Sequence, residues 1–323
     1  MKVLFLAPHL STGGMPQFLL KRIEAIKQCT SDIEIFVYEW EQTSIYYTVQ
    51  RDRIEELVGD NFYSCGYIRD GNSDGWARKQ NGLIDYCYKN KINVIHVEDV
   101  AEDYNSNKNL LDDLFDKKHP WKIVETPHDH TLWIGTNKQK EPDGYAFVIN
   151  HNHDHNAKAS TIIEYPIDHS IIHPKSREEL LDNAGWRTTG EYHILNVGLW
   201  QPDKNQKYAL RLARKFWEKY RWTYIFHFVG NQAPNFKNYW EPLMKDLPPN
   251  VLIHGEKHGH EVSEFYKMSD VLLFPSIDEC NPIVLKEGIS NNIKILAYNQ
   301  KHYGDIYTNY IETSSGGVNE DFD

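Results

Sequence analysis

The stretch Ser269–Gly288, SDVLLFPSIDECNPIVLKEG, carries the clearest information on the fold of this chain. It contains a continuous apolar run, Val271–Phe274, of the kind that forms a strand buried on both faces of a parallel sheet. A polar turn with Glu279 follows, and Asn281 and Pro282 then supply an N-cap and a first helical residue. The stretch therefore predicts a buried strand, a polar turn and a helix start in immediate succession.

The same alternation runs through the rest of the chain. Strands are expected at the apolar runs Val3–Ala7, Ile33–Tyr38, Val94–Val97, Ile123–Glu125, Ala146–Ile149, Thr161–Ile163, Tyr192–Val197, Tyr224–Val229, Val251–His254 and Lys294–Ala297. Helices are expected among them at Asp74–Lys89, Asn107–Phe115, Lys204–Lys219, Phe236–Lys245, Glu261–Met268 and Pro282–Ser290. Strands that alternate with helices predict an α/β protein with parallel sheets.

A polar segment, Asp168–Glu191, has no strand pattern and separates two series of strands and helices. The 323 residues suffice for two domains of ordinary size. We therefore expect two Rossmann-like, doubly wound domains, residues 1–170 and 171–300, and a short tail of residues 301–323. Such domains bind ligands at the carboxyl ends of their strands, which predicts a central cleft that takes a phosphate-bearing ligand.

Charge and composition exclude several classes of protein. The formal net charge is −11 and no stretch is rich in arginine, so the chain is not expected to bind nucleic acid. No apolar run approaches the roughly 20 residues that cross a bilayer. The apolar start is too short for a signal peptide, and the four cysteines have no paired or ligand-like spacing. We expect a cytoplasmic protein; contact with a membrane surface and self-association stay open.

Two carboxylates flank the helix start of the opening stretch. Helix amides and the positive end of the helix dipole favour an anion or a sugar hydroxyl at such a corner. Glu287 lies on the helix, and because helical side chains lean toward the N-terminus, its carboxylate is expected to approach the turn that carries Glu279. Both could instead be ordinary solvated residues, and for an isolated pair of glutamates this would be the better interpretation.

Seven residues separate Glu279 from Glu287, and the stretch around them resembles the E-x7-E signature of family 4 retaining glycosyltransferases, which have the GT-B fold. The resemblance implies that Glu279 contacts the donor sugar and that Glu287 holds the ribose of the nucleotide. It also implies that the backbone at the helix start meets the sugar and the diphosphate, at Asn281, Pro282, Ile283 and Val284. The Cys280-Asn281-Pro282 triplet departs from the family, which commonly has a glycine there.

The segment around Gly198 resembles the strand-then-phosphate loop of the same family. Lys204 matches a lysine that binds the diphosphate. The family's arginine is replaced by Leu199, so one of two cations expected to stabilise the leaving diphosphate is missing. Lys207 is a candidate substitute.

Further resemblances follow in the family's order. Gly13 and Gly14 resemble the family's Gly-rich loop that approaches the diphosphate, and His128 resembles the histidine of a strand-end His-Asp pair near the donor sugar. Gly230 resembles the glycine at a strand end that borders the nucleotide, and Lys257 lies in a segment that resembles the loop that meets the base. Each is weak alone, since a glycine after a strand is most often a turn. Their common order supports the resemblance.

The expected reaction is transfer of a sugar from a nucleoside diphosphate sugar to a hydroxyl acceptor, with retention at the anomeric carbon. The donor expected is a UDP- or GDP-sugar, and the acceptor is a glycan, a lipid or a small molecule. His128, Glu279 and Lys204 are the expected catalytic residues. No cofactor and no metal are expected, because the helix dipole and Lys204 supply the charge that a metal would supply.

Two alternatives stay open. Leu199 and the short tail are compatible with a non-catalytic nucleotide-sugar-binding relic. A metal-dependent hydrolase would use the histidine-rich run of His151, His153 and His155 with His128. A helix is expected to begin at that run, however, and its three histidines would not share one helix face.

Overall fold

A computed structural model describes most of the chain, namely residues 1–11, 13–40, 49–64, 73–99, 108–128, 139–148, 159–167, 171–186, 192–298 and 311–314. The chain divides into two compact units, Met1–Pro166 and Ile167–Asp323. The division lies four residues before the expected boundary at 170/171. Each unit is an α/β domain with one parallel sheet.

The first unit holds a seven-stranded sheet in the order β3-β2-β1-β4-β5-β6-β7. Its strands are β1 (Lys2–Ala7), β2 (Glu34–Glu39), β3 (Phe62–Ser64), β4 (Val94–Glu98), β5 (Lys122–Thr126), β6 (Gly144–Phe147) and β7 (Ser160–Ile162). Its helices are α1 (Gly14–Cys29), α2 (Val49–Val58), α3 (Ser73–Asn90) and α5 (Lys108–Leu114). All neighbouring strands pair in parallel, as the buried apolar runs predict.

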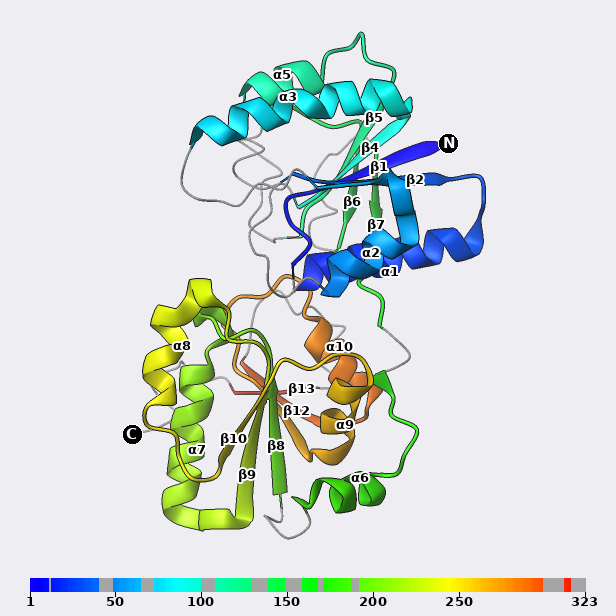
Figure 1. Ribbon diagram of the computed structural model, residues 1–323. Helices are drawn as coiled ribbons and strands as arrows, with labels where there is room; N and C mark the ends of the chain where they lie inside the picture. The colour runs from blue at the N-terminus through cyan, green and yellow to red at the C-terminus, as the bar shows by residue number, and fades with distance from the viewer. Residues whose placement is uncertain are drawn as a thin grey trace. The chain divides into compact units, whose positions relative to one another are not determined.

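Alternate residues of each strand face opposite sides of this sheet, and both sides are covered (Figure 1). Leu4 and Leu6 of β1 pack in a core with residues of α3 and α5. Val3 and Phe5 pack in a second core with residues of α1 and α2. Strand β1 lies inside the sheet and is therefore apolar at every position from Val3 to Ala7, which explains the strength of its sequence pattern.

The second unit holds a six-stranded sheet in the order β10-β9-β8-β11-β12-β13. Its strands are β8 (Tyr192–Val197), β9 (Tyr224–Val229), β10 (Val251–Gly255), β11 (Val271–Phe274), β12 (Lys294–Tyr298) and β13 (Ile311–Ser314). Its helices are α6 (Arg177–Ala184), α7 (Gln206–Tyr220), α8 (Lys237–Met244), α9 (His260–Met268) and α10 (Ile283–Ser290). Here too all neighbouring strands pair in parallel.

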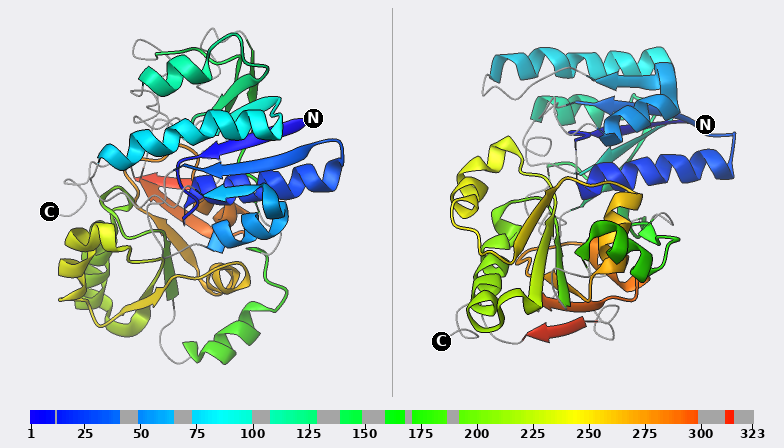
Figure 2. Two further views of the ribbon diagram at one scale, coloured as in Figure 1. Left: turned by 45° about the horizontal axis from the view of Figure 1, so that its top comes forward. Right: turned by 60° about the horizontal axis from the view of Figure 1, so that its bottom comes forward.

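Helices cover both faces of the second sheet as well, and the layers can be followed from other directions in Figure 2. Leu195 of β8 and Leu272 of β11 lie in a core with residues of α6, α9 and α10. Ile194 and Leu273, one residue along in each strand, lie in a core with α7 and with the apolar side of α8. This is the doubly wound arrangement that the strand and helix alternation predicts.

Four elements were not predicted from the sequence. Helix α2 and the short strand β3 follow β2, and helix α6 lies in the polar segment assigned to the domain boundary. The fourth is β13, which lies in the tail and pairs with β12 as the sixth strand of the sheet. No helix in the part of the chain that the structure describes has the length and apolar character needed to cross a membrane.

Candidate functional site

In both sheets the strand order reverses beside the first strand of the unit. β1 lies between β2 and β4, and β8 lies between β9 and β11. At these positions the connections that follow two neighbouring strands run to opposite sides of the sheet. Open α/β sheets bind ligands at such switch points, beyond the carboxyl ends of the strands. Most of the predicted site residues lie in loops after β8, β9 and β11 in the second unit and after β1 and β5 in the first; Lys257 follows β10, and Glu287 lies on α10.

Lys204 and Glu279 meet at the switch point of the second unit. Lys204 Nζ lies 2.5 Å from Glu279 Oε1, and the two side chains are 25% and 10% exposed. Lys204 ends a 3₁₀ turn, Pro202–Lys204, before α7 and is not part of that helix, which corrects the predicted helix start. The backbone amide of Ile277 donates to the carbonyl of Asp203 at 2.8 Å and so joins the two loops. The ion pair therefore joins two loops that a backbone hydrogen bond also holds together.

Gly198 and Gly230 follow β8 and β9 and lie against each other. A Cβ on Gly230 would stand 1.9 Å from the carbonyl oxygen of Gly198, and Gly230 has a φ of 150°. Its amide donates to the carbonyl of Gly255 at 2.8 Å, at the end of β10. Only glycine satisfies both the backbone angle and the close approach, so this edge of the sheet presents backbone in place of side chains.

Helix α10 begins at Ile283, one residue later than predicted. Pro282 stands at the N-cap position with extended backbone angles, and no side-chain hydrogen bond caps the helix. The prediction of Asn281 as N-cap and Pro282 as first helical residue is therefore wrong by one position. The ring of Pro282 is buried, while Asn281 and Val284 are half-buried. In the first turn the amide of Leu285 donates to the carbonyl of Pro282 at 3.2 Å, while α-helix geometry gives the amides of Ile283 and Val284 no intrahelical partner, so this end suits an anion.

Glu287 is held from the neighbouring helix. Tyr266 of α9 donates its hydroxyl to Glu287 Oε2 at 2.8 Å. Tyr266 is 1% exposed, and burial, together with the charge of Glu287, raises its pKa well above the ordinary value. The hydroxyl therefore stays protonated and keeps the Glu287 carboxylate oriented. The two glutamates of the pair thus have different anchors, a lysine for Glu279 and a tyrosine for Glu287.

The remaining basic candidates differ in their surroundings. Lys257 follows β10, and its Nζ lies 3.1 Å from Glu261 Oε1 on α9. Lys207 is exposed on the first turn of α7. Leu199, at the position of the missing arginine, is half-buried, and its carbonyl accepts from Gln206 Nε2 at 2.8 Å.

In the first unit, the Gly-rich loop leads from β1 into α1. Gly13 occupies the N-cap position and Gly14 is the first helical residue; both are exposed. The loop therefore presents exposed backbone at a helix N-terminus, beside the switch point between β1 and β4.

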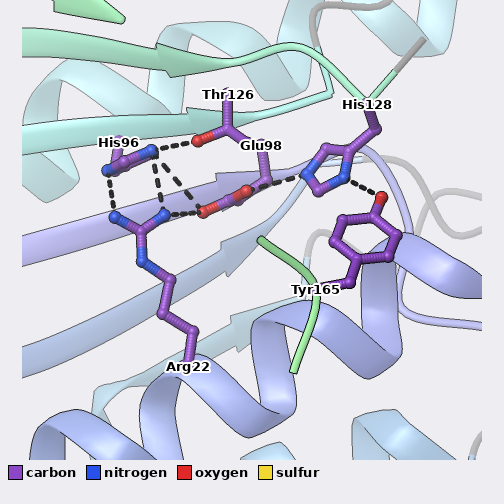
Figure 3. A network of polar contacts seen from close by, with 6 residues as sticks. All are labelled: Arg22, His96, Glu98, Thr126, His128 and Tyr165. Carbon is purple, nitrogen blue, oxygen red and sulfur yellow. Dashed lines mark hydrogen bonds and ion pairs between the residues drawn. The ribbon is translucent and has the colours of Figure 1, made fainter. Parts of the chain in front are cut away.

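His128 lies in a buried polar network, shown in Figure 3. Its Nε2 is 2.9 Å from Glu98 Oε2, and its Nδ1 is hydrogen-bonded to the hydroxyl of Tyr165. Arg22 of α1 donates to Glu98 Oε1 at 2.8 Å and also contacts the ring of His96 at 3.1 Å. The His128 side chain is only 6% exposed. The predicted sugar-facing histidine therefore has both ring nitrogens in contact with protein groups.

The charges of this network balance. Burial alone would raise the pKa of Glu98, but His96, the hydrogen bond with His128 and the Arg22 guanidinium lower it to about 2. Burial lowers the pKa of His96 to about 3, against the attraction of Glu98. At neutral pH Glu98 is therefore a carboxylate and His96 is uncharged. Arg22 supplies the positive charge that a buried carboxylate requires.

The sequence predictions missed Glu98, Arg22 and Tyr266. Glu98 and His96 had a visible signal, because each interrupts an otherwise apolar strand, β4. A polar residue that is buried in a strand needs a partner. Arg22 and Tyr266 lie on helices with no local pattern that marks them, and only the packing of α1 and α9 on the sheets brings them to their carboxylates.

A metal-dependent hydrolase would need a cluster of metal ligands, and the described residues contain none. No group of three or more His, Cys, Asp or Glu side chains there is arranged to hold a metal ion. Within that part of the chain, His128 points to Glu98 and Tyr165. His151, His153 and His155 lie outside the described residues.

Residues 178–316 match the family model described as "Glycosyl transferases group 1". No curated protein sequence matches the chain. The matched segment covers the loops with Lys204, Gly230 and Glu279, but it does not extend to the first unit.

Several solved structures are similar to the whole chain. Anabaena Alr3699/HepE in complex with UDP-glucose has a TM-score of 0.69 at 12% identity, over 93% of this chain and 80% of that one. Sucrose-phosphate synthase from Thermosynechococcus elongatus has a TM-score of 0.66 at 13% identity, over 92% and 81%. WaaG, a glycosyltransferase involved in lipopolysaccharide biosynthesis, has a TM-score of 0.64 at 14% identity, over 98% and 87%. The architecture of the chain is GT-B, with two Rossmann-like domains.

Proposed function

We propose that this chain is a retaining glycosyltransferase that takes a sugar from a UDP- or GDP-sugar and transfers it to a hydroxyl acceptor. The observation that carries the proposal is the pair of Lys204 and Glu279. These residues are 75 positions apart, yet they meet at 2.5 Å at the switch point of the second unit. A lysine and a carboxylate beside a helix N-terminus are suited to a ligand that joins a diphosphate to a sugar.

Each group has a role in this reaction. Lys204 and the first amides of α10 would stabilise the negative charge of the leaving diphosphate, which makes a metal unnecessary. Glu279 would accept from hydroxyls of the donor sugar, and Glu287, oriented by Tyr266, would accept from the ribose. Glu279 is the ion-pair partner of Lys204 in the structure, and a bound diphosphate would take its place as the partner of the lysine.

Two lines of similarity support the proposal. The segment that contains Lys204, Glu279 and Glu287 matches the group 1 glycosyl transferase model. The similar Alr3699/HepE structures hold UDP, alone or with glucose, or UDP-glucose.

The first test is a thermal-shift screen against UDP- and GDP-sugars, because a ligand that binds only the folded protein raises its melting temperature by mass action. Sugar transfer and donor hydrolysis are then measured with the stabilising donor, and the anomeric configuration of the product is read by NMR. Glu279→Ala is expected to abolish transfer without loss of folding. Lys204→Met is expected to weaken donor binding about tenfold or more, since it removes a charge-assisted contact.

Lys237→Met is the matched control, because Lys237 is 58% exposed and faces Glu241 on the surface of α8. It should leave donor binding unchanged. Unaltered transfer by Glu279→Ala would refute the assignment of that residue. Donor binding without hydrolysis or transfer to any acceptor would show a binding protein and not an enzyme.

A further inference from the structure

Helix α7 carries an exposed row of basic side chains along its length, beside the second sheet (Figure 1). The row has one residue in each turn, at a spacing of four positions: Lys207, Arg211, Lys215 and Lys219. Side chains at this spacing lie one above the other on a helix face, so the four cations form a stripe about 18 Å long. The opposite face of the helix packs in the core of the second unit.

The helix and the turn after it carry far more basic than acidic charge. Residues 206–222 include six basic residues and one acidic residue, Glu218, a net charge of +5 in a chain whose net charge is −11. Like charges four positions apart repel each other and destabilise a helix, so the row does not serve the stability of α7. A surface whose charge departs in this way from that of the whole chain is suited to an anionic partner.

Cations of this row are available to such a partner. Among the described residues, no carboxylate forms an ion pair with Lys207, Arg211 or Lys219. The carboxylate of Asp246, at the end of α8, pairs with Arg214 of α7 at 2.9 Å instead. The protein therefore leaves the positive charge of these three side chains unneutralised within the part of the chain that the structure describes.

Exposed aromatic side chains continue the row at its C-terminal end. Tyr220 is 40% exposed, Trp222 is 54% exposed, and Tyr192, at the start of β8, is 46% exposed. The Nζ of Lys219 lies 5.0 Å from the centre of the Tyr220 ring. Tyr224 joins the tyrosines, because its ring centroid lies 5.3 Å from that of Tyr220 and 5.1 Å from that of Tyr192. The cations and the aromatic rings therefore form one continuous surface.

The turn that presents Trp222 has a strained backbone. Arg221 has a φ of 55° and a ψ of −124°, a combination that residues other than glycine rarely adopt. Its guanidinium lies 5.2 Å from the centre of the Trp217 ring, and Trp217 packs edge to face with Trp222 at a centroid distance of 4.9 Å. Strained backbone persists where the surrounding structure enforces it, and it clusters at functional sites. The strain at Arg221 thus coincides with the exposed indole at the end of the basic row.

The α7 surface consists of the basic row, Arg221 and the three exposed aromatic residues: Lys207, Arg211, Lys215, Lys219, Tyr220, Arg221, Trp222 and Tyr192. We propose that this surface binds a membrane that contains anionic lipids. Each Lys or Arg near anionic headgroups strengthens binding about fivefold. Tyr and Trp rings have an apolar body and a polar edge, so they favour the boundary between headgroups and hydrocarbon. A soluble polyanion offers no such boundary, and the exposed rings therefore favour a lipid surface as the partner.

The test is co-sedimentation of the full chain with phosphatidylcholine vesicles, with and without about one-third phosphatidylglycerol. The anionic vesicles should bind the protein more tightly, and added salt should weaken this binding because it screens exposed charges. Arg211→Gln combined with Lys219→Gln should bind the anionic vesicles about thirtyfold more weakly, since two cations are lost. Lys237→Gln combined with Lys294→Gln is the control: it changes the net charge equally, at exposed positions on α8 and β12, and should change binding less than about twofold.

Trp222→Ala tests the aromatic part of the α7 surface. It should weaken binding to the anionic vesicles about threefold or more, because the exposed indole leaves water in the bound state. The melting temperature of each variant shows that it folds, and all the substituted side chains are exposed.

Equal binding to the two kinds of vesicle, or equal binding by the two double variants, overturns the proposal. Unchanged binding by a folded Trp222→Ala also overturns it, in favour of a soluble polyanion. A single-stranded oligonucleotide would then bind the protein with the same dependence on Arg211 and Lys219. No donor sugar enters these measurements, so they decide on the α7 surface whether or not the proposed function holds.

Discussion

Acid is expected to destabilise the second unit through three histidines on neighbouring strands. His193 Nδ1 lies 3.0 Å from His227 Nε2, and His227 Nδ1 lies 3.0 Å from His254 Nε2. Trp186 stacks on the middle ring at a centroid distance of 3.7 Å. Each N–N contact holds one proton, so the chain is complete when all three rings are neutral. Both nitrogens of His227 lie in these contacts, so a proton added to His227 would place a second donor in one of them and break it.

His227 is fully buried, and burial, with smaller contributions from His254 and His193, lowers its pKa from 6.5 to about 2. The unfolded chain therefore binds a proton that the folded protein does not, at any pH between these values. Stability from this residue is complete above pH 6.5 and is lost as the pH falls toward 2. From pH 6.5 to about pH 5 the loss is roughly 2 kcal/mol, since each pH unit corresponds to about 1.4 kcal/mol.

The perturbation is His227→Gln, whose amide still donates and accepts but does not titrate. At pH 7.5 the variant should be less stable by about 1 to 2 kcal/mol, because the imidazole contacts are replaced by poorer ones. Near pH 5 the difference should shrink or reverse by roughly 2 kcal/mol. The assay is urea unfolding followed by circular dichroism at several pH values. The low pKa of His96, in the first unit, is common to both proteins and cancels in the comparison.

His258→Gln is the control, because the side chain of His258 is 39% exposed and lies in the loop after β10. Its free energy of unfolding should follow that of the unaltered protein at every pH. If His227→Gln and the unaltered protein lose stability in parallel between pH 7.5 and 5, His227 is not the residue that couples folding to protons.

Two further substitutions test the packing of the site. Gly230→Ala should destabilise the protein by about 3 kcal/mol or more, because its Cβ would lie 1.9 Å from the carbonyl oxygen of Gly198. Gly255→Ala is the control and should cost only about 1 kcal/mol, because Gly255 has a φ of 69° but a Cβ there would have no atom within 4 Å. Equal melting temperatures of the two variants would contradict this. Arg22→Met should cost about 3 kcal/mol, since it leaves Glu98 charged and buried, whereas Arg53→Met, at a 50% exposed side chain, should cost under about 1 kcal/mol in the same urea assay.

The sequence alone determined the class of the fold. A parallel strand that is buried on both faces is apolar at every position, so Val3–Ala7 and Val271–Phe274 could be recognised without knowledge of their neighbours. The strong local signals of the second domain, a buried strand followed by a polar turn and a proline at the helix start, also located Glu279. Helix α6 also has a local signal at its start, where Ser176 and Glu179 form a capping box. That pattern was visible in the sequence.

Only the tertiary structure decided which side chains meet. The order of strands in each sheet brings Glu279 to Lys204, and it brings Glu98 to His128 and Arg22. Local patterns depend on residues three or four positions apart, whereas these contacts depend on the pairing of strands and the docking of helices. His128 stays a prediction of the sequence as a site residue, whereas the carboxylate of Glu98 and the phenol of Tyr165 that contact its ring nitrogens are placed beside it by the fold alone.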